Sequence, residues 1–286
     1  MTPKGIAPPA GTPVYEALDG AITAFAAAGC DTPRLDAELL LAHALGVSRE
    51  RLFIDSDLTI AGTAVRTFQD FVRRRSVLRE PVAYILGRRH FRRLELMVDR
   101  RALIPRPETE LLVEVAVTLP QGSQVLDVGT GSGAVALALK DEHPDLCVSG
   151  SDVSAGALAL ARSNAERLGL DVRWFSADML AGVAHEFDAI LANPPYVSDG
   201  DRRHLAPEIL RHEPPSALFA GADGLEAIRS LVTQAGAHAS LRMLALEVGA
   251  GQAATVGGLM RSAGFPTVRA ERDLGGVERV VVGERS

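Results

Sequence analysis

The spacing of hydrophobic residues changes along the chain from a helical to an extended pattern. From residue 14 to about residue 86, apolar side chains recur every three or four positions, which predicts a small domain of amphipathic helices. Residues 1–13 are rich in Pro, Gly and Thr, which predicts a loose tail. Residues 91–98 then show partial alternation of apolar and polar side chains, which predicts a hairpin or connecting strands.

From residue 123 onward, short apolar runs alternate with helical stretches. Strands that alternate with helices form a parallel sheet joined by crossover helices, so this part of the chain is predicted to be α/β. The predicted strands lie at 125–128, 147–151, 172–175, 187–192 and 243–248, with extended segments near 267–271 and 277–282. The predicted helices lie at 134–140, 154–168, 225–239 and 250–263. The expected division is a helical domain over 1–85, a β-hairpin linker over 86–105 and an α/β domain over 106–286.

Composition narrows the class of protein. Of 286 residues, 47% are hydrophobic and 23% are charged, which excludes a disordered chain. The formal net charge of -6 disfavours a protein that binds nucleic acid through its phosphates. No apolar run approaches the ~18 residues of a membrane span, and the N-terminus lacks the apolar core of a signal peptide, so a cytoplasmic protein is expected. Cys30 and Cys147 are expected to be reduced and buried.

A glycine-rich segment joins the first predicted strand of the α/β domain to its helix. It is Asp-Val-Gly-Thr-Gly-Ser-Gly over residues 127–133, and its glycines permit a sharp turn and a close approach of a ligand. The spacing fits a dinucleotide, but the same layout serves S-adenosylmethionine, whose zwitterionic end Asp127 can help to hold. The loop therefore leaves both cofactors open. Its candidate cofactor-binding residues are Gly129, Thr130, Gly131, Ser132 and Gly133.

Two acidic residues follow the next two predicted strands. Asp152 directly precedes a helix, so it can either accept hydrogen bonds from the two hydroxyls of a ribose or cap that helix. Asp178 can accept from an adenine amino group, and Met179 can pack on the ring. Both acidic positions fall at the carboxyl edge of the predicted sheet, where open α/β sheets bind their ligands.

Asn193-Pro194-Pro195-Tyr196 follows the strand predicted at 187–192. Two prolines stop that strand and hold Asn193 rigidly at the edge of the sheet. The side-chain oxygen of Asn193 and the carbonyl of Pro194 can both accept from one NH2 group, and Tyr196 offers a face to a flat group. Such a site suits methyl transfer to the planar nitrogen of a base or an amide, held in line with a sulfonium methyl group. The segment therefore favours S-adenosylmethionine over a nicotinamide cofactor.

The glycine-rich loop and the Asn-Pro-Pro-Tyr segment together resemble class I S-adenosylmethionine-dependent methyltransferases, which include adenine N6-methyltransferases and protein-glutamine methyltransferases. The helical N-terminal region, Leu-Ile-Pro-Arg-Pro-Glu-Thr-Glu over residues 103–110 and the segment 273–279 resemble the peptide chain release factor glutamine methyltransferases (the HemK/PrmC family). This resemblance covers nearly all of the chain after its N-terminal tail. It implies a Rossmann-like, mostly parallel sheet with a small N-terminal helical domain.

The resemblance also implies an activity in translation termination. The chain would transfer a methyl group from S-adenosylmethionine, leaving S-adenosylhomocysteine, to the side-chain N5 of the glutamine in the Gly-Gly-Gln motif of release factors. The helical domain would contact the release factor, with no direct requirement for nucleic acid, a membrane or a metal. The implied cofactor-binding residues are Gly129, Thr130, Gly131, Ser132, Gly133, Asp152, Asp178, Met179 and Asn193. The implied glutamine-binding residues are Asn193, Pro194, Pro195 and Tyr196, with Asn193, Pro194 and Tyr196 as the catalytic ones.

The residues themselves leave competing classes of function open. One is an adenine N6-methyltransferase that acts on DNA or RNA, which would share the Asn-Pro-Pro-Tyr segment and could use the arginines at positions 88, 89, 92 and 93. Another is a cofactor-binding module without catalysis, and a third is an NAD dehydrogenase, for which the sequence indicates no acid or base to handle a hydride. The arginine run at positions 73–75 is expected to be a solvated face. His90, His204 and His212 lack metal-site spacing and are expected to be ordinary surface or loop residues.

Overall fold

The computed structural model describes residues 11–55 and 57–285. The described chain divides into two compact units: residues up to Gly87 together with Pro207–His212, and Arg88–Ala206 together with the chain from Glu213 onward. The division at Gly87 falls inside the linker expected over 86–105, and the hairpin belongs to the second unit. Most of the tail expected over 1–13 lies outside the described residues.

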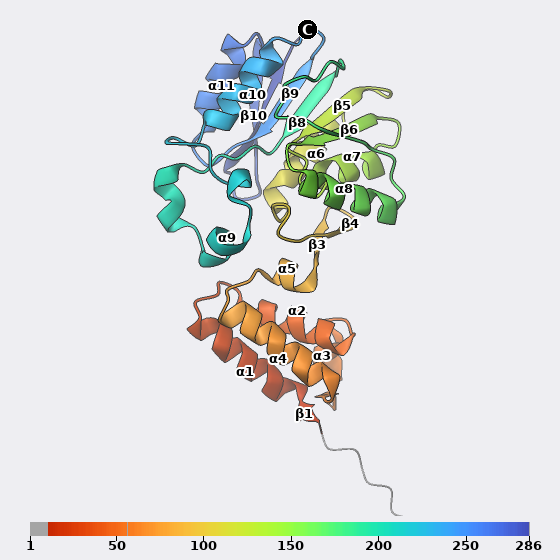
Figure 1. Ribbon diagram of the computed structural model, residues 1–286, viewed down its shortest axis with the longest axis vertical. Helices are drawn as coiled ribbons and strands as arrows, with labels where there is room; N and C mark the ends of the chain where they lie inside the picture. Colours follow the sequence, from red (N-terminus) through yellow and green to blue (C-terminus); the bar gives the residue numbers. More distant parts are fainter. Residues whose placement is uncertain (1–10, 56, 286) are drawn as a thin grey trace, which may run out of the picture. The chain divides into compact units, whose positions relative to one another are not determined.

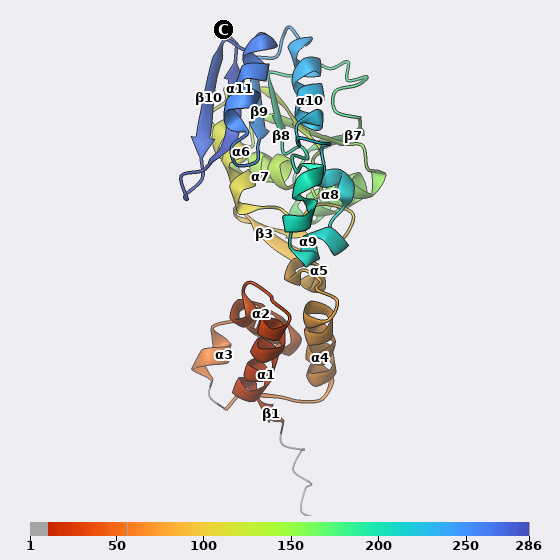
Figure 2. The same ribbon diagram turned by 90° about the vertical axis from the view of Figure 1, so that its left-hand side faces the viewer.

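The first unit is a helical bundle, as the periodicity predicts. Its elements are β1 (Thr12–Pro13), α1 (Val14–Ala27), α2 (Pro33–Leu45), α3 (Arg51–Ile54), β2 (Thr59–Ile60), α4 (Thr63–Ser76) and α5 (Val82–Leu86), and helix α9 (Pro207–His212) completes the unit. Figure 2 shows α1, α2 and α4 lying side by side, and Phe25, Leu40 and Leu41 are fully buried among them. Strands β1 and β2 form a short antiparallel pair.

Ion pairs fasten α9 to the other helices of this unit. The Arg75 guanidinium is only 5% exposed and donates to Asp36 at 2.7 Å and to Glu208 at 3.2 Å. Arg79 donates to the second oxygen of Glu208 at 2.6 Å. The expectation of a solvated face over residues 73–75 is therefore wrong for Arg75, because its partners come from α2 and α9, far away in the sequence. It holds for Arg73, which stays exposed.

We expect Arg75→Met to destabilise the helical unit by about 3–5 kcal/mol. The reason is that the substitution leaves the carboxylates of Asp36 and Glu208 buried without their shared cation. The matched control is Arg73→Met on the same helix, which removes only an exposed pair with Asp70 and is expected to cost less than about 1 kcal/mol. Urea denaturation followed by circular dichroism measures both. Equal losses from the two substitutions would contradict the role assigned to Arg75.

Two other sequence-based expectations need correction. His212 is buried, not a surface residue, and its Nε2 donates to the Leu78 carbonyl at 2.9 Å within the helical unit. Cys30 is buried as expected, but Cys147 is exposed at the start of its strand. Both cysteines are free. Within residues 11–55 and 57–285, no group of three metal-ligating side chains forms a candidate metal centre.

The second unit is built on a seven-stranded sheet in the order β10-β11-β9-β8-β5-β6-β7. The strands are β5 (Gln124–Val128), β6 (Cys147–Asp152), β7 (Arg173–Ser176), β8 (Ala189–Ala192), β9 (Met243–Glu247), β10 (Thr267–Arg272) and β11 (Glu278–Glu284). Five strands, from β9 to β7 in the sheet order, run parallel, and β11 lies antiparallel between β9 and β10. The mostly parallel α/β sheet and the helical N-terminal region predicted from the sequence are both confirmed.

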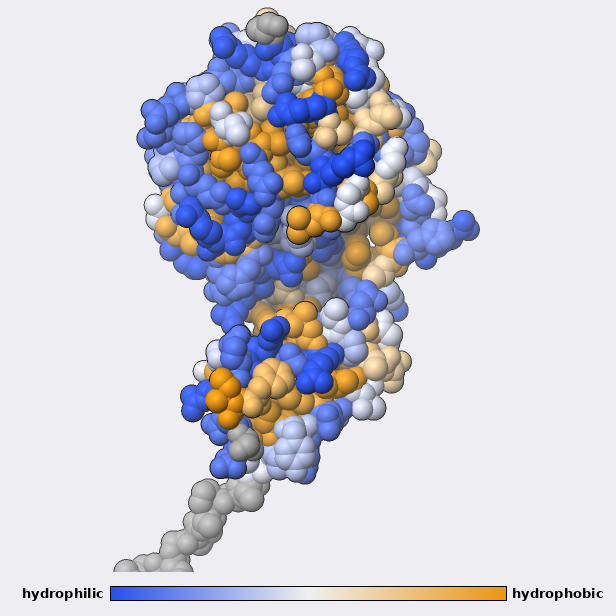
Figure 3. All heavy atoms as spheres, turned by 180° about the vertical axis from the view of Figure 1, so that it is seen from behind, coloured by the Kyte–Doolittle hydropathy of each residue, from blue (hydrophilic) through white to orange (hydrophobic). Residues whose placement is uncertain are grey.

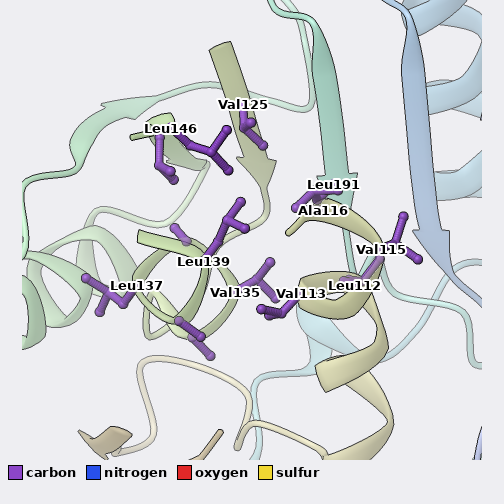
Figure 4. Packing of buried hydrophobic residues seen from close by; sticks show 14 of the residues in the cluster. Leu112, Val113, Val115, Ala116, Val125, Val135, Leu137, Leu139, Leu146 and Leu191 are labelled. Carbon is purple, nitrogen blue, oxygen red and sulfur yellow. The ribbon is translucent and has the colours of Figure 1, made fainter. Parts of the chain in front are cut away.

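Helices cover both faces of this sheet (Figure 1). The helices on one face are α6 (Glu110–Ala116), α7 (Ala134–Glu142) and α8 (Ala155–Leu168), and those on the other are α10 (Glu226–Gly236) and α11 (Ala253–Ser262). Successive residues of a strand point to opposite faces, so Leu191 packs with α6 and α7 while its neighbour Ile190 packs with α10 and α11. Figure 4 shows the first of these two cores. Because both of its faces are buried, the central strand β8 is a continuous apolar run, and its neighbour β9 is apolar up to its final residue, Glu247.

The hairpin predicted within residues 86–105 is formed by β3 (Arg88–Phe91) and β4 (Leu94–Met97). Short elements fill other connections, where the hydrophobic pattern predicts none: the 3-10 turn η1 (Pro107–Thr109) precedes α6. The long connection after β8 contains η2 (Asp199–His204), α9 and η3 (Pro215–Ala217). These elements are too short to produce a hydrophobic period, which explains why the pattern did not reveal them. None of the helices described is both long and apolar enough to cross a bilayer.

Candidate active site

A cavity of about 470 Å³ opens at the carboxyl ends of the parallel strands in the second unit. This size suits a small ligand, and the place is the one where α/β sheets bind ligands. Its walls come from the ends of β5, β6, β7 and β8 and from segments 100–105 and 214–217. Ten of the twelve candidate site residues border it: Gly129, Thr130, Gly131, Ser132, Asp152, Asp178, Met179, Asn193, Pro194 and Pro195. The other two, Gly133 and Tyr196, lie elsewhere.

The glycines of the loop after β5 have distinct physical roles. Gly129 and Gly131 adopt φ of +70° and +57°, in the left-handed region that side chains disfavour. A Cβ on Gly129 would meet no atom within 4 Å, so the absence of a side chain there leaves room for a ligand. Gly133 instead serves packing, because its Cβ would lie 3.0 Å from Leu137 and 3.1 Å from Trp174.

Asp127 places a buried carboxyl on the wall of the cavity. One of its oxygens accepts from the Thr130 hydroxyl at 2.6 Å and from the Ala136 amide at 3.3 Å. Burial raises the pKa of the Asp127 carboxyl to about 7. A cationic group that binds beside it would favour the ionised form, so the site is suited to an ammonium group.

The Asp152 carboxylate is held by two backbone amides. Its Oδ2 accepts from Gly131 at 3.0 Å, and its Oδ1 accepts from Ser154 at 2.8 Å. The alternative role as a helix cap belongs instead to Ser154, whose hydroxyl accepts from the Ala157 amide. Each carboxylate oxygen keeps lone pairs for a further donor, so the group can accept from two neighbouring hydroxyls.

Two features of the cavity wall indicate that a polar ligand belongs there. The buried Ser132 hydroxyl has no hydrogen-bond partner among the described residues, and Ser132 borders the cavity. Such groups are rare in folded proteins unless a ligand or water satisfies them. Met179 has a φ of +52°, and strained backbone of this kind gathers at ligand sites. The residues present therefore fit a ligand that has hydroxyl or amino groups and also a flat apolar part.

Asn193 follows β8 and is oriented by a residue distant in the sequence. Its Nδ2 donates to the Thr109 hydroxyl at 3.1 Å, and that hydroxyl donates to Glu247 Oε2 at 2.5 Å. The described residues form no hydrogen bond with Oδ1 of Asn193, which remains an acceptor at the cavity. The next residue, Pro194, has a carbonyl but no competing N–H.

Tyr196 is not on the cavity wall, although the sequence suggested that its ring would face a flat group. Its hydroxyl donates to Glu247 Oε1 at 3.3 Å, and its ring lies 3.2 Å from the Cβ position of Gly249. Burial raises the pKa of the Tyr196 hydroxyl. In this structure Tyr196 anchors the segment through its bond to Glu247 and does not line the space for a ligand.

Sequence reasoning gave no role to Thr109, Glu247 and Glu213. Glu247 is 1% exposed at the end of β9, and an acidic residue closing an otherwise apolar run was the signal that could have found it. Thr109 lies in the segment 103–110, but no neighbouring residue in the sequence indicates that its hydroxyl has a role in the site. Glu213 accepts from Arg106 at 2.6 Å and from the Ile104 amide at 3.4 Å, so it holds the segment before α6 against the wall.

The chain is similar to known proteins over most of its length. Residues 16–87 match the family model described as PrmC N-terminal domain, and residues 107–221 match the one described as Methyltransferase small domain. The release factor glutamine methyltransferase of Rhodospirillum rubrum is 40% identical over 263 residues, which cover 90% of this chain and 81% of that protein. The protein of the same name from Xylella fastidiosa is 44% identical over 274 residues, which cover 92% of this chain and 97% of that protein.

Solved structures share the fold of the chain. A methyltransferase from Pyrococcus furiosus matches with a TM-score of 0.51 at 19% identity, covering 67% of this chain and 88% of that one. The T. thermophilus 16S rRNA N2 G1207 methyltransferase, in complex with AdoMet and guanosine, matches with a TM-score of 0.51 at 18% identity, covering 70% and 50%. At such identities the likeness concerns the fold alone. The curated relatives, in contrast, are similar along nearly the whole of both chains, and this chain belongs to the release factor glutamine methyltransferase family.

Proposed function

We propose that this chain transfers a methyl group from S-adenosylmethionine to the side-chain N5 of the glutamine in the Gly-Gly-Gln motif of release factors. The observation that carries the proposal is the amide of Asn193, which is anchored through Nδ2 and keeps Oδ1 as an acceptor beside the cavity. Family membership supports the same activity.

The cavity residues divide into those for the cofactor and those for the substrate. The turn from Gly129 to Ser132 would hold the methionine part, with its ammonium group next to Asp127. Asp152 would accept from the ribose hydroxyls, and Asp178 and Met179 would hold the adenine. When bound, the cofactor supplies an electrophilic methyl group on its sulfonium.

Asn193 and Pro194 would act on the substrate nitrogen. An amide nitrogen is a poor nucleophile because its lone pair is delocalised into the carbonyl. The Asn193 Oδ1 and the Pro194 carbonyl would each accept one hydrogen of the glutamine NH2 group, favouring a pyramidal nitrogen that can attack the methyl group. These acceptors would also stabilise the positive charge that develops on that nitrogen. The transfer would break the bond between the sulfonium sulfur and the methyl carbon, leaving S-adenosylhomocysteine, and the methylated nitrogen would release one of its two protons to water.

The decisive experiment incubates the protein with S-adenosylmethionine and an unmodified release factor and then analyses the peptides by mass spectrometry. We expect one methyl group, located on the glutamine of the Gly-Gly-Gln motif. Parallel reactions contain total RNA and DNA. Methylation of adenine in those samples, with an unmodified release factor, would contradict the proposal and favour the nucleic-acid enzyme.

Arg92 and Arg93, two of the four arginines at positions 88, 89, 92 and 93, are paired with carboxylates, which counts against a nucleic-acid substrate. Arg92 is bound by Glu142 at 2.8 Å and Glu114 at 2.9 Å, and Arg93 pairs with Asp141 at 3.1 Å. Guanidinium groups engaged in this way offer little charge to a phosphate backbone. Together with the net charge of -6, they weaken the argument for an adenine methyltransferase.

We expect Asp152→Ala to weaken cofactor binding about tenfold to a hundredfold, since hydrogen bonds to a charged group contribute roughly 1.5–3 kcal/mol. The Gly131 amide loses its acceptor as well, which acts in the same direction. Isothermal titration calorimetry with S-adenosylmethionine measures the change. The control is Asp171→Ala, which removes an exposed carboxylate outside the cavity. An affinity like that of the unaltered protein would overturn the assignment of Asp152.

We propose further that the helical unit contacts the release factor. One face of this unit carries exposed apolar side chains among polar ones (Figure 3). Tyr15 and Phe53 of this unit are 61% and 53% exposed. Both border a hollow of about 370 Å³ together with Asp19 and Arg34. A surface of this kind fits a protein partner, because aromatic and arginine side chains dominate protein–protein binding.

Phe53→Glu should raise KM for the intact release factor about tenfold, the effect of losing roughly 1.4 kcal/mol of binding. A short peptide that contains Gly-Gly-Gln should be methylated as before, since it lacks the rest of the release factor, which is the part proposed to contact the helical unit. The control is Leu274→Glu in the second unit, where an exposed apolar residue does not border the hollow. Steady-state kinetics with both substrates measures the two KM values. An equal rise in KM for the peptide and for the release factor would contradict the proposed contact between the helical unit and the release factor.

A further inference from the structure

A buried chain of hydrogen bonds connects three separate elements to the amide of Asn193. Glu247 ends β9, Thr109 closes the 3-10 turn before α6, and Asn193 follows β8. Glu247 and Thr109 are only 1% and 4% exposed, so water competes little for the bond between them. The distances are 2.5 Å from Thr109 to Glu247 and 3.1 Å from Asn193 to Thr109.

A hydroxyl can donate only one hydrogen bond, and this limit fixes the direction of each hydrogen bond from Asn193 to Glu247. Thr109 has one hydrogen to donate, and a carboxylate can only accept, so the hydrogen of Thr109 goes to Glu247. The Thr109 oxygen can then only accept from its other neighbour. That neighbour must present an N–H, which turns Nδ2 of Asn193 toward Thr109 and leaves Oδ1 for the cavity.

We propose that Glu247 is a positioning residue, which acts through Thr109 to fix the orientation of the Asn193 amide and thereby makes Oδ1 the acceptor for the substrate. The inference rests on the proposed function, because it explains how one of the two acceptors for the glutamine NH2 group is held. Glu247 does not border the cavity, so it acts through Thr109 and not on the substrate directly. Its effect is to exclude the flipped amide, in which Nδ2 would face the substrate and repel its N–H groups.

The orientation of the Asn193 amide depends on the negative charge of Glu247. A protonated carboxyl can donate to Thr109, which frees the hydroxyl hydrogen of Thr109 for Oδ1 of Asn193 and permits the flipped amide. The groups that face the carboxyl are the Thr109 and Tyr196 hydroxyls, Glu108 and Arg279. Burial is the largest influence and raises the pKa of Glu247 to about 7. The amide is therefore expected to lose its orientation as the pH falls below neutral.

Nuclear magnetic resonance tests the orientation without any reference to catalysis. The chain contains two asparagines, Asn164 and Asn193, so labelling with 15N-asparagine gives two side-chain NH2 pairs, assigned by the loss of one in Asn193→Asp. We expect the Asn193 pair to titrate with a midpoint near pH 7. Asn164, whose amide donates to the carbonyls of Met97 and Ser132, is the internal control and should not move.

Substitutions of Thr109 and Glu247 distinguish an effect of the hydrogen bonds from an effect of packing. Thr109→Val keeps the shape but removes the hydroxyl, so the Asn193 signals should shift and lose their titration, and Thr109→Ser should restore both. Glu247→Gln should abolish the titration because an amide does not ionise near neutral pH. Asn193 signals that are unchanged in Thr109→Val, or that still titrate in Glu247→Gln, would overturn the inference. The test does not depend on the identity of the substrate, because it measures the orientation of the Asn193 amide in the protein alone.

Kinetics at saturating cofactor add the functional consequence. In Thr109→Val we expect kcat to fall about tenfold to a hundredfold, the effect of losing one buried hydrogen bond that orients a reacting group. Thr109→Ser should recover most of this loss. The wild-type kcat should decline below pH 7, and this decline should be absent in Glu247→Gln. Thr118→Val, on a hydroxyl that bonds only its own helix end, should behave as the wild type.

Discussion

Asn193→Ala should reduce methyl transfer to the release factor by at least about 10²–10³-fold, the usual effect of removing one preorganised electrostatic partner. The variant loses the Oδ1 acceptor and also leaves the Thr109 oxygen without its donor. The fold should survive, because Asn193 is only half-buried and the β8 strand before it is unchanged. The measurement is kcat at saturating cofactor, with the thermal midpoint as the folding control. Turnover close to that of the wild type would refute the claim that this segment holds the methyl acceptor.

Asn193→Asp separates the two functions of the same side chain. It keeps an acceptor oxygen for the substrate but replaces the NH2 group that binds Thr109. Since the Thr109 hydrogen is already given to Glu247, the new carboxylate would face a lone pair. We therefore expect Asn193→Asp to fail nearly as badly as Asn193→Ala. Adding Glu247→Gln supplies an NH2 group to Thr109 and frees its hydrogen for the new carboxylate, so the double variant should recover about tenfold in kcat.

Gly224→Ala should lower activity about a hundredfold, because a displacement of roughly 1 Å at a reacting group costs that much. Gly224 has a φ of +72°, and a Cβ there would lie 2.3 Å from the carbonyl oxygen of Tyr196 and 3.0 Å from the Ser198 amide. Those atoms are backbone and cannot rotate away. The Asn-Pro-Pro-Tyr segment must therefore move, and its acceptors move with it.

Gly276→Ala is the matched control for this prediction. Gly276 has a similar φ of +78°, so the substitution introduces the same backbone strain, but its Cβ would meet no atom within 4 Å. Gly276→Ala should lose a little thermal stability, and Gly224→Ala should lose more because its Cβ also overlaps backbone atoms. Only Gly224→Ala should lose activity on a Gly-Gly-Gln peptide. Equal activities of the two variants would show that the segment tolerates the displacement.

The sequence by itself determined the features that depend on local patterns. Apolar runs such as 187–192 and 243–248 mark strands buried on both faces, and the glycines after β5 mark the turn, because each depends on neighbouring residues only. The order of strands and helices then brings the loops after β5, β6, β7 and β8 to one edge of the sheet. For that reason ten candidate residues could be named in advance that border a single cavity.

Only the tertiary structure decided which side chains support that cavity. Glu247 lies 138 positions after Thr109, and Arg75 lies 133 positions before Glu208, so no local period could pair them. Tyr196 has the chemistry to face a ligand, but the buried carboxylate of Glu247 offers its hydroxyl a partner on the other side. A buried polar group must find a hydrogen-bond partner wherever the fold brings one near. The sequence states which groups need partners, and the packing of distant elements determines which partners they find.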